Sequence, residues 1–136
     1  MKVKHLNLYK RIIITQLLCI VFAIISEVHI RLLITNDWWF TNVNLLAIEF
    51  IILTIVFTLL ITLFLDGIYI NILIISILYL IYFFIISWIS SKIFTTNTSS
   101  EDYGVGLIGV SISFCQWISI MISSIIGTFI RRYSHR

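Results

Sequence analysis

Four stretches of about 20 mostly apolar residues set the limits on how this chain can fold. They run from about Ile12 to Ile34, Val43 to Leu65, Ile68 to Ser90 and Val105 to Ile130. A membrane-spanning helix needs a stretch of this length, and the sequence contains no proline to interrupt one. The period of two that is typical of membrane β-barrel strands is absent. We therefore expect an all-α integral membrane protein with four transmembrane helices in a compact bundle.

The composition supports this fold class. The 136 residues are 60% hydrophobic and 11% charged, whereas soluble domains have about 25% charged residues. We expect a single four-span membrane domain over residues 1–136, with a helical hairpin at Asp66-Gly67 and one polar outer loop at about 92–104. The first span lacks the cleavage pattern of a secretory signal, so it is expected to stay in the mature chain.

Basic residues at the span ends predict the orientation. Seven of the nine Lys and Arg residues flank the first and fourth spans on the terminal side: Lys2, Lys4, Lys10, Arg11, Arg131, Arg132 and Arg136. Lysine and arginine favour the cytoplasmic side, so both termini are expected in the cytoplasm of a plasma-membrane protein. The net charge of +3 is then explained by topology, and nucleic acid is not expected as a partner.

Small and weakly polar residues indicate where helices contact one another. In the fourth span they recur at every fourth position, as Ser111, Cys115, Ser119, Ser123 and Gly127. This stripe predicts helix packing rather than catalysis by the serines. The threonines of the second span, Thr54, Thr58 and Thr62, are expected to bond to backbone carbonyls one turn back.

Glu49 is the most unexpected residue for a membrane span. It lies about six residues into the second span, roughly 9 Å along the helix axis. A carboxylate at that depth costs about 2–3 kcal/mol or more if it faces lipid. It lies on a different helix face from the three threonines, so we expect it to face a different neighbour, such as a second subunit. It is a candidate coupling residue; the competing interpretation is a structural hydrogen bond.

Glu27, His29 and Arg31 form a second polar cluster, near the outer boundary of the first span. Glu27 and Arg31 are four residues apart, in the order that favours an ion pair, while His29 points to the opposite side of a helix. Together with Trp38 and Trp39, which are expected at the outer interface, they form a candidate outer-boundary binding site.

Motifs of enzymes and cofactor sites are missing. Gly104 to Gly109 fits the G-x-G-x-x-G pattern but follows no strand, so a dinucleotide site is not expected. We expect no catalytic residues, no cofactor and no metal. The 32 isoleucines against 2 alanines point to an AT-rich genome, most simply that of a low-GC bacterium.

These observations predict a small accessory or interaction protein that stabilises, regulates or confers immunity on another membrane component. Its expected partners are the lipid bilayer and either another membrane protein or further copies of itself. The alternative is a small oligomeric transporter that uses Glu49 as an intramembrane coupling carboxylate. An intramembrane enzyme using Glu27, His29 and Asp37 is the least favoured of the three.

Overall fold

The computed structural model describes residues 8–36, 43–94 and 103–134, which form four α-helices with their short connections. The helices are α1 (Leu8–Asn36), α3 (Val43–Phe64), α4 (Ile70–Ile93) and α5 (Tyr103–Tyr133). Each contains a segment long and apolar enough to cross a membrane. The expectation of an all-helical chain with four such helices is confirmed. Trp38, Trp39 and most of the expected polar loop lie outside the described residues.

The helices extend beyond the apolar stretches at several ends. α1 starts at Leu8 and therefore includes Lys10 and Arg11, and α5 continues to Tyr133 and includes Arg131 and Arg132. Lysine and arginine are good helix formers, and their long side chains reach away from the apolar segment. Hydropathy therefore marks the apolar part of each helix and not its full length.

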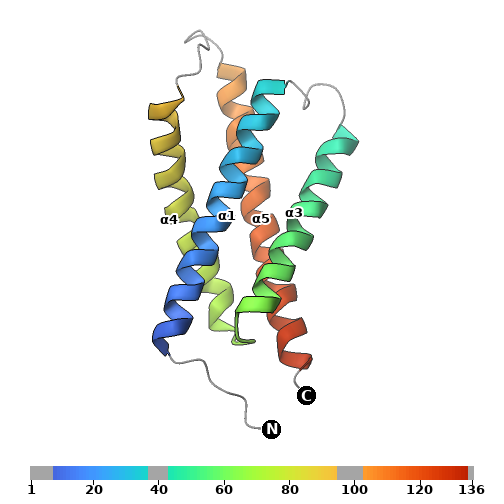
Figure 1. The fold of residues 1–136 in the computed structure, drawn as a ribbon. Helices are drawn as coiled ribbons and strands as arrows, with labels where there is room; N and C mark the ends of the chain where they lie inside the picture. The colour runs from blue at the N-terminus through green and yellow to red at the C-terminus, as the bar shows by residue number, and fades with distance from the viewer. Residues whose placement is uncertain (1–7, 37–42, 95–102, 135–136) are drawn as a thin grey trace.

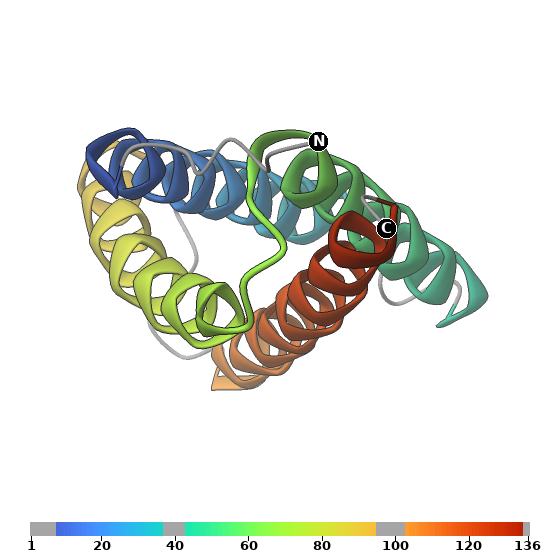
Figure 2. The same ribbon diagram turned by 90° about the horizontal axis from the view of Figure 1, so that it is seen from below.

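The four helices run roughly along a common axis, and α1 starts at the end of the bundle where α5 finishes (Figure 1). We call the opposite end, which holds the end of α1 and the start of α3, the distal end. α3 packs on α5, α1 packs on α4, and α4 also contacts α5. The interface between α1 and α3 is the smallest of those formed. In the view along the bundle the helices surround a shared centre (Figure 2).

The expected hairpin at Asp66-Gly67 is wrong in one respect. The connection is short, but within the described residues α3 and α4 share no interface, because the segment between them crosses the base of the bundle (Figure 2). Gly67 permits this crossing, since an added Cβ would lie 2.8 Å from the backbone nitrogen of Arg132. The turn is closed by Asn71, whose Nδ2 donates to the Asp66 carbonyl at 2.9 Å.

Aromatic and β-branched side chains fill the centre. The rings of Phe22 and Phe57 lie 4.6 Å apart between α1 and α3, and Ile75, Tyr79 and Ile120 complete the core from α4 and α5. The outward faces of all four helices are aliphatic and aromatic, as expected for contact with lipid.

The two halves of α3 are packed very differently. From 44 to 56 no residue of α3 is buried, and the buried positions begin at Phe57 and continue with Ile61. The distal half of α3 therefore lies at the edge of the bundle, where Leu46, Phe50 and Leu53 are only partly buried against the core.

Candidate functional site

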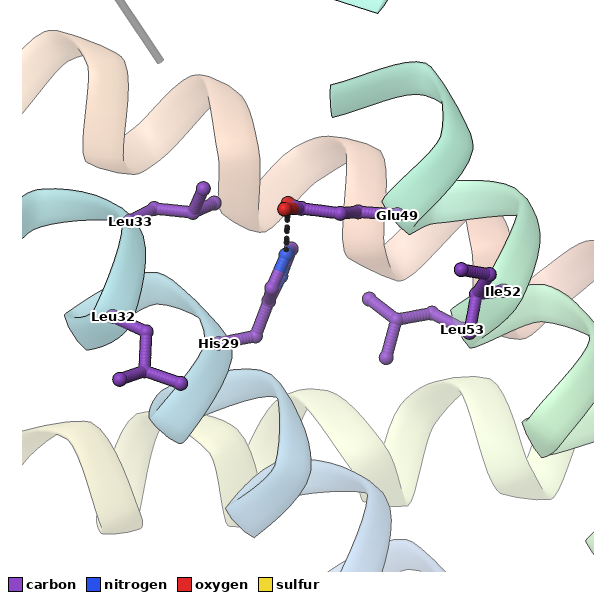
Figure 3. Close-up of a pocket in the computed structure, with 6 residues that line it drawn as sticks. All are labelled: His29, Leu32, Leu33, Glu49, Ile52 and Leu53. Carbon is purple, nitrogen blue, oxygen red and sulfur yellow. Dashed lines mark hydrogen bonds and ion pairs between the residues drawn. The ribbon is translucent and has the colours of Figure 1, made fainter. Parts of the chain in front are cut away.

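Glu49 of α3 is bonded to His29 of α1. The carboxylate Oε2 lies 2.9 Å from the imidazole Nε2, and the two side chains point toward each other across the gap between the helices (Figure 3). The His29 side chain is 14% exposed and that of Glu49 is 25% exposed. Glu49 was expected to face a neighbour such as a second subunit, and in the structure that neighbour is α1 of the same chain.

Gln116 of α5 extends this pair into the core. Its Nε2 lies 2.9 Å from Nδ1 of His29 and donates a second hydrogen bond, at 3.1 Å, to the backbone carbonyl of Ser26. Gln116 and Ser26 are fully buried. A hydrogen-bonded network thus runs from the α3 carboxylate through the α1 imidazole to the α5 amide, and it joins three helices at the same height in the bundle.

The Ser26 carbonyl determines the protonation pattern of His29. A carbonyl oxygen only accepts hydrogen bonds, so the NH₂ group of Gln116 must face it, and the same group then faces Nδ1 of His29. Nδ1 therefore accepts, and the imidazole proton is on Nε2, where it donates to Glu49. In this arrangement the imidazole is neutral, and the Glu49 carboxylate is the hydrogen-bond acceptor at the end of this network.

A pocket of about 220 Å³ lies beside the His29–Glu49 pair. It is lined by these two residues and four aliphatic ones: Leu32 and Leu33 from α1, and Ile52 and Leu53 from α3 (Figure 3). The ring of Phe50 meets the imidazole edge-on, with centroids 5.9 Å apart. The pocket is thus an apolar groove between α1 and α3 with a single carboxylate–imidazole pair as its polar surface, and we call it the α1–α3 groove.

A buried polar atom of this hydrogen-bonded network lacks a partner. Within the described residues, Oε1 of Gln116 is buried without a hydrogen bond, whereas the hydroxyls of Ser26 and Tyr79 lie close enough to interact with each other. An unsatisfied buried polar atom costs about 1–3 kcal/mol. An apolar residue in this position would avoid that cost, so stability alone does not account for the cluster.

The predicted ion pair of the first span is confirmed. Nε of Arg31 donates to Oε1 of Glu27 at 2.9 Å, one helical turn apart. The guanidinium also lies over the ring of Phe94, 5.2 Å from its centroid. Glu27 and Arg31 lie on the side of α1 away from His29, so the structure does not bring the predicted boundary residues together into one site. α1 is helical throughout, and Glu27 is buried in the bundle rather than at its surface.

The small-residue stripe of α5 is divided between two environments. Ser119, Ser123 and Gly127 are buried. The Ser123 hydroxyl lies 3.0 Å from the carbonyl of Thr54, and Gly127 lies directly against Ile61. Ser111 and Cys115, nearer the distal end, are exposed. The stripe therefore contributes to the α3–α5 contact only over its buried part, from Ser119 to Gly127.

The threonines of α3 behave as predicted. The hydroxyls of Thr54, Thr58 and Thr62 each donate to the carbonyl four residues earlier, at 2.8, 2.7 and 2.7 Å. They satisfy their own hydrogen bonds and need no partner helix.

Sequence reasoning missed Gln116 and the backbone carbonyl of Ser26. A primary amide within an apolar span is itself a signal, because its donors and acceptor need partners that lipid does not supply. No family model, curated protein or solved structure matches the chain, so its function is argued from this geometry.

Proposed function

We propose that this chain is a small multi-pass interaction protein of the plasma membrane, with both termini in the cytoplasm. It binds another membrane component through the α1–α3 groove and thereby stabilises it, regulates it or protects it. The role is one of binding rather than catalysis. The orientation rests on the seven basic residues that flank the first and fourth spans.

The observation that carries this proposal is the α1–α3 groove with its polar pair. Aliphatic residues exposed to lipid are ordinary, but a partly exposed carboxylate and imidazole among them are costly and mark functional positions. The distal half of α3 has no buried residue, so a partner gains contacts there without displacing packed side chains. Small residues on the adjoining part of α5, Ser111 and Cys115, are also exposed.

Native mass spectrometry of the tagged protein, extracted gently from its own membrane, tests the proposal. We expect a stoichiometric complex with a different membrane protein. A photo-crosslinking residue in place of Ile52, which lines the groove, should capture the same partner. The control position is Ile77 on α4, which is similarly exposed but remote from the groove, and a crosslinking residue there should not capture the partner. A protein that is monomeric in lipid and crosslinks equally from both positions contradicts the proposal.

A second candidate is the oligomeric transporter that uses Glu49 for coupling. The observation in its favour is the hydrogen bond between Glu49 and His29, two groups that can exchange a proton, at the level of a partly open groove. Glu49→Gln would then abolish proton-coupled flux while insertion stays intact. A homo-oligomer in the mass spectrum, with flux that depends on Glu49, would favour this function over the first.

A further inference from the structure

The α1–α3 groove contains a carboxyl group that has no Lys or Arg partner within the described residues. The only bond formed by the Glu49 side chain there is the one to His29, and that imidazole is neutral because Nδ1 accepts from Gln116. Arg31 is the one Lys or Arg between Arg11 and Lys92 in the sequence, and it is bonded to Glu27 on the other side of α1. The groove therefore presents a carboxylate whose complement is a cation.

The size of the pocket limits what that cation belongs to. At about 220 Å³ the pocket is smaller than the roughly 300–1,000 Å³ of typical small-molecule sites. It has room for one long side chain with an aliphatic stem, which Leu32, Leu33, Ile52 and Leu53 would contact. Lysine and arginine have such a stem and a charged end that bonds to carboxylate.

The surface around the pocket has a shape on which a second helix could pack. Ile48, Ile52 and Ile55 lie on one face of α3, spaced by four and three residues, and each is more than half exposed. This stripe runs along α3 beside the pocket, in the half of the helix where no residue is buried. A second helix lying along it would place one side chain in the pocket.

We propose that the α1–α3 groove binds a membrane-spanning helix of a partner protein through one Lys or Arg, whose charged group pairs with the Glu49 carboxylate. His29 and Gln116 are positioning residues, because their hydrogen bonds hold the carboxylate toward the pocket. Glu49 sets the depth in the membrane at which the partner's Lys or Arg must lie, because it is six residues into α3, or roughly 9 Å along the helix axis. This inference rests on the proposed function and specifies what the partner must carry.

Designed peptides test the recognition chemistry directly. The probe is a leucine–alanine transmembrane peptide with a single Lys six residues from one end, and its controls carry Leu at that position or the Lys near the other end. Association with the full chain is measured by energy transfer in phosphatidylcholine vesicles. We expect the matched Lys peptide to bind about tenfold more tightly than the Leu peptide, as for a charge-assisted hydrogen bond.

Three variants separate this effect from general changes in folding. Glu49→Gln should abolish the preference for Lys, and Asp66→Asn, which removes a carboxylate near the opposite end of the bundle, should keep it. Ile52→Trp should also abolish the preference by filling the pocket while leaving the carboxylate in place. Because Ile52 is more than half exposed, this variant should fold even if Glu49→Gln does not.

The outcomes distinguish failure of this inference from failure of the proposed function. Equal binding of the Lys and Leu peptides, or a preference that survives Glu49→Gln, overturns the inference even where a partner protein has been found. A preference for Lys without any partner complex in the native membrane supports the groove chemistry and rejects the proposed function. Loss of peptide binding when phosphatidylethanolamine is added would assign the pocket to a lipid ammonium group and likewise overturn the inference.

Discussion

His29 and Glu49 are bonded across the smallest of the helix interfaces in the bundle, with Nε2 and Oε2 2.9 Å apart. In the distal half of α3 no residue is fully buried, and Leu46, Phe50 and Leu53 pack against the core only partly buried. The pair therefore serves as the polar link between α3 and α1. The consequences for stability and for the chemistry of the imidazole are measurable.

The link between α1 and α3 should appear as a coupling energy. In a double-mutant cycle of His29→Ala and Glu49→Ala, we expect the two losses of unfolding free energy to be non-additive by about 1 kcal/mol or more, as for a hydrogen bond to a charged group. The measurement is equilibrium unfolding by SDS in mixed micelles. Additivity to within about 0.5 kcal/mol would show that the bond contributes nothing to the fold.

The proton of the His29 imidazole should be found on Nε2. Nitrogen NMR of the labelled protein in lipid should show an unprotonated Nδ1 and a protonated Nε2, because Gln116 donates to Nδ1. Gln116→Leu removes that donor, so the Nδ1-protonated form should become populated. Gln16→Leu, which removes an exposed glutamine from α1, is the matched control and should leave the spectrum of His29 unchanged. A protonated Nδ1 in the wild-type protein would refute the assignment.

Gly127 should be intolerant of even one added carbon. A Cβ there would lie 2.8 Å from Cγ2 and 3.1 Å from Cβ of Ile61, and 3.3 Å from the Thr58 carbonyl, so α3 would have to move. We expect Gly127→Ala to lower the free energy of unfolding by about 1–3 kcal/mol. Gly109→Ala is a matched control on the same helix, since nothing lies within 4 Å of its added Cβ. Equal stability of the two variants would show that α3 and α5 do not approach closely at Gly127.

Removing only one partner of the Glu27–Arg31 pair should lower the free energy of unfolding, whereas removing both should change it little. Arg31→Leu leaves the buried Glu27 carboxylate without its partner, and we expect a loss of about 1–3 kcal/mol, below the full penalty of a buried pair because Arg31 is partly exposed. The double variant Glu27→Leu with Arg31→Leu should recover most of that loss. Lys92→Leu, which removes an exposed basic residue from α4, should have little effect. Thermal unfolding in bicelles compares the four proteins, and a double variant less stable than Arg31→Leu would contradict the explanation.

The features that depend on neighbours along the chain could be predicted from the sequence. Four apolar stretches predicted four helices, and the four-residue spacing predicted both the Glu27–Arg31 pair and the backbone bonding of the α3 threonines. These features are local, because a helix fixes which residues lie one turn apart before any tertiary contact forms. The sequence also predicted that His29 points to the side of α1 opposite Glu27, because the two residues are two positions apart.

The choice of neighbouring helices and the residues that complete the hydrogen-bonded network depend on tertiary contacts. α3 and α4 are consecutive in the sequence but do not pack together, and Glu49 is paired with His29 and, through it, with Gln116, 67 residues further along the chain. The physical reason is the nature of these helices. They are apolar on nearly every face, and lipid provides no hydrophobic force to select the face that turns inward. That choice is made by close packing at Gly127 and by hydrogen bonds between helices, which join residues far apart in the sequence.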